Sequence, residues 1–392
     1  MSIALRCTGL LAAAVALGVV APGVSQASVG PDARPIQPVD FVVPLARADR
    51  AQGSAVTVAT IPMWSSSIAA SQNGKKYRYQ MVGQDPRVRL ANPATTIVAN
   101  IIPIVVKLSD GTTFDPTTKS CGETVSPLNA ALASPVFENT TFRSGGTNVG
   151  NTQYADAFQR ASFWAYTKPS GINPGYHVVL EPKVGKTISI TVPAASGRLD
   201  TGPSCDAAEV TMAYAVSQGL KLLPSLAAKP WGVSPKTFPI FLLHNVEFDT
   251  KLGTPGSVGF HAAVPNPAFH GAAQTVAVAS YLDAAVSSRE SDIAVLSHEI
   301  GEWMDDPLGT NPTPPWGNTG QVHGHCQSNL EVGDPLTGTT FAVTRAGVTY
   351  HPQELAFFSW FYGPATSTGV NGSFSFNGTL THPAPLCPPG GA

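Results

Sequence analysis

The chain is poor in charged residues and has no long apolar segment after its N-terminus. Charged residues make up 12% of the 392 residues and the formal net charge is −2, whereas an average domain is roughly 25% charged. A nucleic-acid or anionic-membrane partner needs a basic surface, which this composition does not supply. The apolar run at residues 10–20 is shorter than the about 20 residues that cross a bilayer. We therefore expect no nucleic-acid partner and no membrane insertion.

Several catalytic and repeat signatures are also missing. Without a Gly-x-Ser-x-Gly sequence, an α/β-hydrolase would lack its nucleophile. A glycine-rich phosphate loop is absent too, as are repeats of solenoid period and heptads. Glycine (37) and proline (35) are abundant instead, and they favour turns and extended segments over a helical bundle.

The N-terminus has the pattern of a secretory signal peptide. A short segment ending in Arg6 precedes the apolar run, and the small-residue site Ser25-Gln26-Ala27 follows it. Cleavage near Ala27 would make residues 1–27 the signal peptide and the mature protein secreted, extracellular or periplasmic. Residues 28–60 are rich in proline and small polar residues, which predicts a flexible leader or a propeptide.

Four cysteines remain after Cys7 is removed with the signal peptide. An even number in an oxidising compartment suggests two disulfides, although four cysteines allow three connectivities. We favour Cys121 with Cys205 and Cys326 with Cys387.

The order of expected elements indicates an α+β fold in two parts. Residues 61–200 form a β-rich domain, in which Asp110-Gly111 is typical of a hairpin turn. A breaker cluster at residues 193–197 marks a soft boundary, and residues 201–392 form the second domain. There a long backing helix, residues 206–223, ends at Pro224. Strands are expected at residues 96–98, 101–106, 176–180, 187–192, 238–244, 258–264 and 274–279.

A helix is expected from about residue 288 to residue 305. Ser287 followed by Glu290 resembles a capping box, and Pro307 disfavours a helical Asp306. Apolar residues at helical spacing define its buried face; they are Ile293, Leu296, Ile300 and Trp303.

The opposite side of this helix carries His298, Glu302 and Asp305. An acidic face opposite an apolar one is usually solvated surface. Here, however, six acidic residues lie between Glu290 and Asp306 without a Lys or Arg. Asp305 and Asp306 also lie at the helix C-terminus, where the macrodipole penalises each negative charge by roughly 0.3–1 kcal/mol. A bound cation would compensate both features.

His298 and Glu302 are one helical turn apart and can reach one ion. A catalytic zinc takes three protein ligands and a water, and we predict Glu331 as the third ligand. Glu299 would be the general base that takes a proton from that water. Zn²⁺ is favoured, whereas a more oxygen-rich site would prefer Ca²⁺ or Mn²⁺.

Further residues are weaker candidates for the metal or its cleft. Asp334, His323 and His325 lie near Cys326, whose disulfide would hold their segment in place. His261 belongs to an expected edge strand. Strand histidines and short His-x-His loops are more often structural or solvated than ligands. Asp305 and Asp306 complete this group.

Three motifs carry a resemblance: Gly259-Phe260-His261, the segment His298-Glu299-x-x-Glu302-x-x-x-Asp306-Pro307, and residues 326–335. Together with residues 79–83 and 152–160, they resemble those of a group of secreted bacterial proteins. The order of backing helix, strands, edge strand and active-site helix is similar to that of zincin-like metallopeptidases. More distantly, the motifs look like those of plant phosphate-induced, EXORDIUM-type extracellular proteins. The zincin resemblance implies a mixed sheet with substrate lying along its edge strand.

These observations predict a secreted metal-dependent peptidase that acts on an extracellular protein or peptide. One departure from the zinc-protease pattern His-Glu-x-x-His is Glu302 in place of the second histidine. The alternative is a non-catalytic extracellular or cell-wall-associated binding protein with a structural cation. A glycan hydrolase using Glu299 and Glu302 is weaker, since no aromatic sugar platform is evident nearby.

Overall fold

A computed structural model describes residues 59–387, apart from residues 120, 228–231, 255, 318–325 and 365. The predicted signal peptide and residues 28–58 of the leader lie outside the described residues. Within them the fold is α+β, as predicted, with a β-rich N-terminal region and a mixed seven-stranded sheet accompanied by helices. No helix in the described part of the chain is long and apolar enough to span a membrane.

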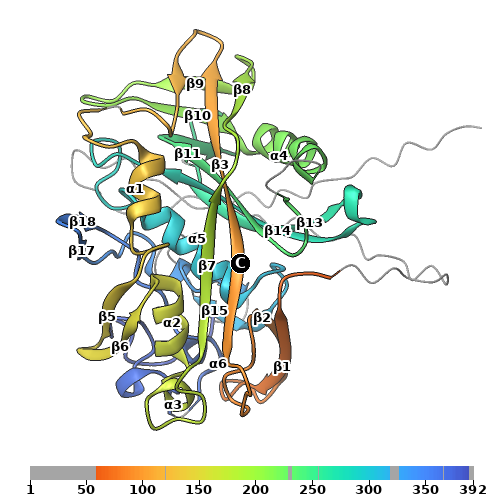
Figure 1. Cartoon of the computed structure of the whole chain (residues 1–392), viewed down its shortest axis with the longest axis vertical. Coiled ribbons are helices and arrows are strands. Elements are labelled where there is room, and N and C mark those ends of the chain that lie inside the picture. Colours follow the sequence, from red (N-terminus) through yellow and green to blue (C-terminus); the bar gives the residue numbers. More distant parts are fainter. Residues whose placement is uncertain are drawn as a thin grey trace, which may run out of the picture.

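The seven-stranded sheet is the centre of the structure (Figure 1). Its main path runs β13 (Gly259–Asn266), β14 (Ala272–Tyr281), β11 (Phe238–His244), β3 (Ala94–Leu108), β4 (Thr113–Phe114). β7 (His177–Val184) and β8 (Ile188–Val192) both pair with the long strand β3. β13 lies at one end of this path, as predicted for the edge strand, and is antiparallel to β14. The sheet takes strands from both sides of residue 200, and the division into two domains there stays a prediction.

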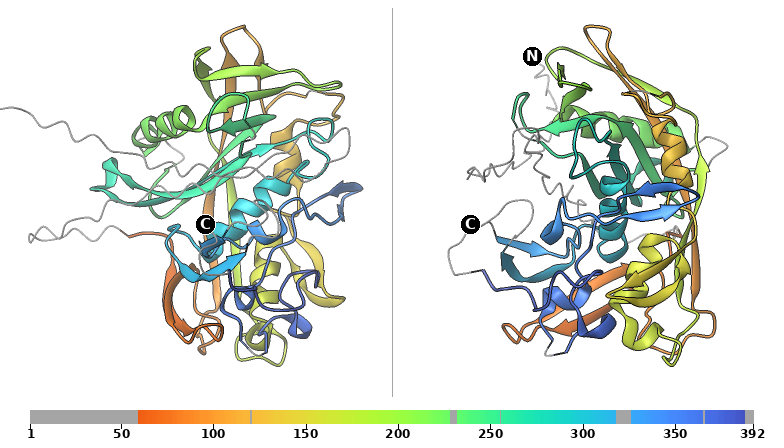
Figure 2. Two further views of the ribbon diagram at one scale, coloured as in Figure 1. Left: turned by 180° about the vertical axis from the view of Figure 1, so that it is seen from behind. Right: turned by 90° about the vertical axis from the view of Figure 1, so that its left-hand side faces the viewer.

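Alternation along the central strands creates two apolar faces. Ile240 and Leu242 of β11 face the core that contains α5 (Ala294–Asp305). Phe241 and Leu243 face the opposite core, which contains residues of α4 (Met212–Ala227). The sheet therefore separates two helices, one on each face. Figure 2, left, shows α5 in cyan in front of the long strands.

All twelve residues of α5 are buried. The predicted apolar face is confirmed, and Trp303 stacks on Phe238 with ring centroids 3.7 Å apart. The predicted start at residue 288 is wrong, because the helix begins at Ala294. Glu290 N–H donates to Ser287 Oγ, which is one half of a capping box, but the Glu290 carboxylate accepts from the Ser287 hydroxyl and not from its backbone N–H. Asp292 then adopts a positive φ of 49°, which prevents a continuous helix from residue 288 into α5.

The predicted backing helix differs at both ends. Residues 207–211 form strand β10 (Ala207–Thr211), so the helix begins only at Met212. Pro224 does not end it but lies inside it, because α4 continues to Ala227. The residues before Met212 pair with β9 (Gly197–Asp200) and β12 (Val246–Asp249) instead. Strand pairing therefore overrides the helical spacing of Asp206–Thr211.

The hairpin and both disulfides are as predicted. β3 and β4 pair around Asp110-Gly111, with Val106 opposite Phe114. Disulfides join Cys121 to Cys205 and Cys326 to Cys387. Three helices interrupt the strands of the N-terminal part: α1 (Pro127–Ala133), α2 (Tyr154–Ser162) and α3 (Trp164–Thr167).

Smaller elements surround α5 and complete the structure. An aromatic core joins α2, α3 and α6 (Phe358–Tyr362) to the N-terminal hairpin. The remaining elements are β1 (Met63–Ala69), β2 (Lys76–Val82), β5 (Thr140–Ser144), β6 (Thr147–Thr152), η1 (Pro267–Phe269), β15 (Pro312–Gly317), β16 (Cys326–Asn329), η2 (Asp334–Leu336), β17 (Val343–Arg345), β18 (Val348–Tyr350) and η3 (Val370–Gly372).

Candidate metal site

Three segments distant in sequence bring imidazoles and carboxylates together. α5 packs against β13 and β14. Phe260 and Ala262 of β13 face the α4 core, so His261 between them points toward α5. The segment after β16 brings Glu331 and Asp334 to the same place. All of these acidic and histidine side chains are buried, which excludes the solvated-surface interpretation of the acidic face.

Glu302 lies at the centre of this group, with each carboxylate oxygen toward a different histidine. Its Oε1 is 3.0 Å from Nε2 of His298, and its Oε2 is 3.4 Å from Nδ1 of His261. Two triads arise, each with ligand atoms within 4.8 Å of one another. One contains His298, Glu299 and Glu302, and the other contains His261, Glu302 and Glu331. Each triad could hold a metal ion.

Neutral amides hold the outer oxygens of the two loop carboxylates. Asn329 Nδ2 donates to Glu331 Oε1 over 2.8 Å, and Gln327 Nε2 donates to Asp334 Oδ2 over 2.6 Å. The inner oxygens face imidazoles: Glu331 Oε2 is 3.8 Å from His261, and Asp334 Oδ1 is 3.6 Å from His298. Such outer partners orient carboxylates toward a metal. The Cys326–Cys387 disulfide anchors β16, the strand that supplies both amides.

Gln353 orients His298 in a similar way. Its Oε1 lies 3.1 Å from His298 Nδ1, and its Nε2 donates to the carbonyl of Gly333 over 2.7 Å. With the proton on Nδ1, this bond directs Nε2 of His298 toward Glu302 and Asp334. No sequence pattern points to Gln353, because it lies 55 residues after His298. Gln327 and Asn329 of β16 had a weak sequence signal, because they alternate along a strand that directly precedes the acidic loop.

Two glycines allow the close packing of this site. A Cβ on Gly333 would lie 2.5 Å from His298 Nδ1, and one on Gly259 would lie 2.6 Å from Glu299 Oε1. Both separations are too short for real side chains. The glycines of the motifs Gly259-Phe260-His261 and Glu331-Val332-Gly333-Asp334 are therefore explained by contact with the site.

The charges of the site are strongly coupled. Burial alone would lower the pKa of His298, but the Glu302 carboxylate outweighs it and raises that pKa to about 9. Burial also lowers the pKa of His261, but the carboxylates of Glu331, Glu299 and Glu302 outweigh burial. Together they raise this pKa well above 6.5. The pKa of Glu302 is lowered, because His298 and His261 outweigh burial. Burial raises the pKa of Glu299.

No arginine or lysine occurs between residues 290 and 344. In the part of the chain that the structure describes, the carboxylates of the site form ion pairs with His261 and His298. Buried carboxylates without a strong cation are costly. The donor set of imidazoles and carboxylates is one that Zn²⁺ and other divalent cations accept.

The two carboxylates at the end of α5 have other contacts. Asp305 Oδ1 accepts from Gln159 of α2, and burial raises the pKa of Asp305 well above 3.8. Asp306 accepts from the backbone N–H groups of Thr310 and Asn311. Its carbonyl oxygen lies 3.1 Å from His261 Nε2. A raised pKa at Asp305 and backbone N–H donors at Asp306 therefore reduce the repulsion between these carboxylates and the helix C-terminus. They can do so without a cation.

A small pocket opens beside His298 and Glu299. Its lining comes from the start of β13, from α5 and from the loops that cover them: Val258, Gly259, Glu290, Val295, His298, Glu299, Thr337 and Gln353. Oε2 of Glu299 is buried and has no hydrogen-bond partner among the described residues. A water molecule or substrate group in this pocket would lie next to both His298 and Glu299.

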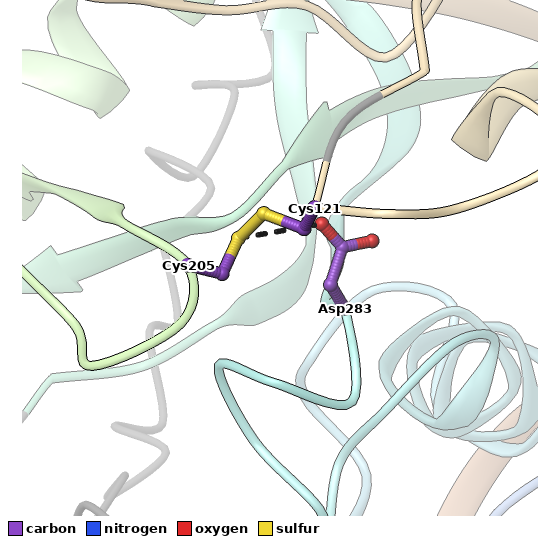
Figure 3. A group of neighbouring side chains, drawn as sticks. All are labelled: Cys121, Cys205 and Asp283. Atoms are coloured by element: carbon purple, nitrogen blue, oxygen red, sulfur yellow. Dashed lines mark hydrogen bonds between the residues drawn. A yellow bond between two sulfur atoms is a disulfide. The ribbon is translucent and has the colours of Figure 1, made fainter.

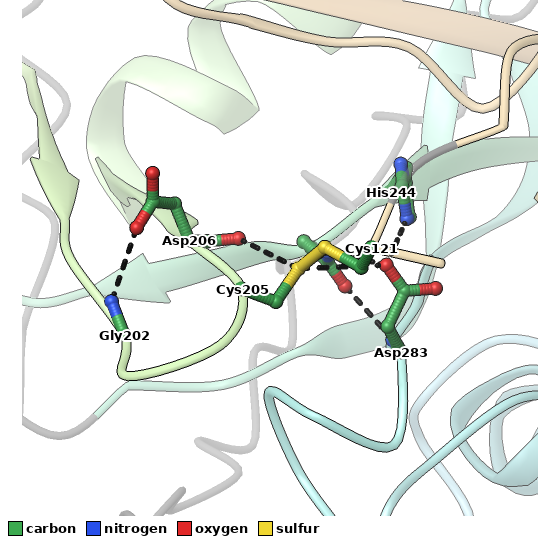
Figure 4. Close-up of a disulfide and its surroundings, with 7 residues drawn as sticks. Cys121, Gly202, Cys205, Asp206, His244 and Asp283 are labelled. Atoms are coloured by element: carbon green, nitrogen blue, oxygen red, sulfur yellow. Dashed lines mark hydrogen bonds and ion pairs between the residues drawn. A yellow bond between two sulfur atoms is a disulfide. The ribbon is translucent and has the colours of Figure 1, made fainter. Parts of the chain in front are cut away.

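A separate group contains Cys121, Cys205 and Asp283 (Figure 3). Its sulfur atoms form a disulfide, which removes the thiolates that a metal would need. Figure 4 shows Asp283 engaged with His244, whose Nε2 lies 2.9 Å from Oδ2. We therefore treat this group as structural.

The structure brings six of the predicted site residues together. His298, Glu299, Glu302, Glu331, Asp334 and His261 converge. His323 and His325 lie outside the described residues. Comparison with known proteins adds no assignment, since no family model, no curated protein and no solved structure matches the chain.

Proposed function

We propose that the protein is a secreted metal-dependent peptidase that hydrolyses extracellular proteins or peptides. The observation that carries this proposal is the convergence of His298, Glu299 and Glu302 beside a pocket under the edge strand. The pattern of an antiparallel edge strand above a helix with a His-Glu pair supports a zincin-like arrangement. Two disulfides support an oxidising, extracellular location.

A divalent cation, with Zn²⁺ favoured, would lower the pKa of a bound water and polarise the substrate carbonyl. His298 and Glu302 would hold it, with Glu331 the third ligand predicted from the sequence. Glu299 suits the role of base because burial raises its pKa toward the working range of general acid–base groups.

The reaction would proceed with Glu299 as proton carrier. Glu299 accepts a proton from water while the water oxygen adds to the peptide carbonyl carbon. The C–N bond then breaks, and Glu299 returns the proton to the leaving nitrogen, which gives a free amine and a carboxylate terminus. β13 is the last strand on its side of the described sheet. An extended peptide could therefore pair along it and be positioned above Glu299.

The test is cleavage of an unfolded protein substrate by purified mature protein, with bound metal measured on the same samples. Glu299→Gln should retain metal but lose at least about 100-fold in rate, the usual effect of removing a general base. Glu181→Gln, an exposed carboxylate on β7, is the matched control and should cleave like wild type. Metal bound without any cleavage by wild type would exclude the peptidase.

One observation favours a second candidate, a binding protein with a structural cation. Every candidate ligand in the described part of the chain is at least nine-tenths buried, and structural metal sites are typically closed. This candidate predicts that metal removal lowers thermal stability while wild type cleaves no substrate.

A further inference from the structure

The two triads share Glu302, and Asp334 adds a further carboxylate beside His298. On one side Glu302 Oε1 lies against His298 Nε2, which also faces Asp334, and Gln327 holds the far oxygen of Asp334. On the other side Glu302 Oε2 meets His261 and Glu331. Asn329 holds the far oxygen of Glu331. Each side therefore offers one imidazole, one loop carboxylate and one oxygen of Glu302.

The interatomic distances suit two ions. Two ligand atoms of a tetrahedral zinc, each about 2.0–2.2 Å from it, are about 3.3–3.5 Å apart. His298 Nε2 is 3.0 Å from Glu302 Oε1 and 3.6 Å from Asp334 Oδ1. His261 Nδ1 is 3.4 Å from Glu302 Oε2, and Glu331 Oε2 lies 3.8 Å from Nε2 of the same ring. Donation of His261 Nε2–H to the carbonyl of Asp306, 3.1 Å away, would leave Nδ1 free as a ligand.

The balance of charge also suits two ions. The buried carboxylates of the site outnumber its imidazoles by four to two; the carboxylates are Glu299, Glu302, Glu331 and Asp334. If all are ionised, two negative charges remain even when both imidazoles are protonated. With neutral imidazoles, one divalent cation also leaves two negative charges. Two divalent cations balance all four carboxylates. Glu299 Oε2, buried without a hydrogen bond, faces this centre 3.8 Å from His261.

We propose that Glu302 bridges two divalent cations, one held with His298 and Asp334 and the other with His261 and Glu331. The inference rests on the proposed metal site, adds a second ion to it, and assigns Glu331 to that second ion and Asp334 to the ion at His298. Paired ions about 3.5–4 Å apart clamp the attacking and leaving groups of hydrolytic reactions. Glutamate at position 302, where the zinc-protease pattern has histidine, then has a role of its own. Its carboxylate has two oxygens and can bind one ion with each.

Metal stoichiometry tests the proposal. Full-length mature protein is stripped with a chelator, loaded with Zn²⁺ and freed of excess ion before its metal content is measured. Wild type should bind two ions per chain, and His261→Ala and Asp334→Asn should each bind one. Glu302→Gln should bind less than one. The exposed His382→Ala and Glu181→Gln are matched controls and should keep two, with circular dichroism reporting the fold of every variant.

A spectroscopic measurement on wild type covers the case in which a variant fails to fold. Mn²⁺ ions bridged by one carboxylate are magnetically coupled, so the electron paramagnetic resonance spectrum of Mn²⁺-loaded wild type should show coupling. One ion per chain with an uncoupled spectrum would overturn the second site and leave the proposed function standing. Absence of any bound Zn²⁺ or Mn²⁺ would overturn both.

Discussion

At the scale of single residues, Gly333 sets how closely the acidic loop approaches α5. A methyl group there would lie 2.5 Å from His298 Nδ1, and Gln353 holds both the imidazole and the carbonyl of Gly333 in place. We expect Gly333→Ala to destabilise the fold by about 1–3 kcal/mol, as overpacking does, and to weaken metal binding. Denaturant unfolding and metal titration measure the two effects.

Gly219 gives the matched control, because it lies inside α4 and a Cβ there would contact nothing within 4 Å. Gly219→Ala should stabilise the protein by about 0.5–1 kcal/mol, since alanine loses less backbone entropy in a helix. Metal binding should not change. Equal destabilisation by both substitutions would contradict the close contact at Gly333.

The protonation of His298 predicts how pH controls metal binding. The metal-free imidazole has a pKa of about 9, whereas a ligand imidazole must be neutral. Binding at neutral pH should therefore release a proton, and affinity should rise as pH increases from about 6 to 9. Calorimetric titration in buffers of different ionisation enthalpy measures the protons released. Binding without proton release at neutral pH would contradict the imidazolium–Glu302 pair.

The same pair sets a stability window for the metal-free protein. Because the folded pKa of His298 is raised from 6.5 to about 9, its contribution is complete below pH 6.5 and is lost as pH rises through 9. The lowered pKa of Glu302 acts in the opposite direction: its contribution is present above pH 4.5 and lost as pH falls below it. Thermal unfolding of chelated protein should therefore show the pair's stabilisation between about pH 4.5 and 9.

At the scale of elements, the sequence predicted those with strong local signals. Apolar spacing placed the buried face of α5, and Asp110-Gly111 placed the hairpin between β3 and β4. It misplaced the start of α5, because the hydrogen bonds between Ser287 and Glu290 form in a separate turn, and Asp292 has a positive φ before the helix begins. It missed β10, because pairing with β9 and β12 is a long-range contact without local periodicity.

The candidate site was predicted most firmly where its residues share a segment, and its hydrogen-bonding partners from other segments were missed. The His-Glu-x-x-Glu spacing identified His298, Glu299 and Glu302 on one helix. His261 ranked low, because only the sheet brings β13 next to α5. Gln353 has no sequence signature, since its role depends on a contact across the fold.

The two disulfides offer a prediction about β16. Loops of 61 and 84 residues should each contribute about 4 kcal/mol in the chain-entropy model. Replacing Cys326 and Cys387 by serine should therefore lower both stability and metal affinity, because β16 positions Gln327 and Asn329. Replacing Cys121 and Cys205 should lower stability by a similar amount and leave metal affinity unchanged. Unfolding and metal titration distinguish these outcomes, and equal loss of affinity in both pairs would contradict a specific role for β16.

At the scale of the whole molecule, the site connects three parts of the chain. His261 belongs to the edge strand, Glu302 to the central helix, and Glu331 to the segment after β16. An ion bound to the folded state alone stabilises it by about 2.7 kcal/mol at a concentration 100 times Kd. Chelation should therefore lower the unfolding temperature, and excess Zn²⁺ should restore it.

The loss of stability should be local before it is global. Without the ion, imidazoles and carboxylates of β13 and the loop at residues 330–336 keep only their hydrogen bonds and mutual ion pairs. Hydrogen exchange should therefore accelerate at β13 and this loop after chelation. The hairpin of β1 and β2, in the aromatic core, supplies no ligand and should keep its exchange rates. Equal acceleration of exchange in the hairpin and at the site would contradict this prediction. An ion that is bound by these three segments should slow hydrogen exchange there more than in the hairpin.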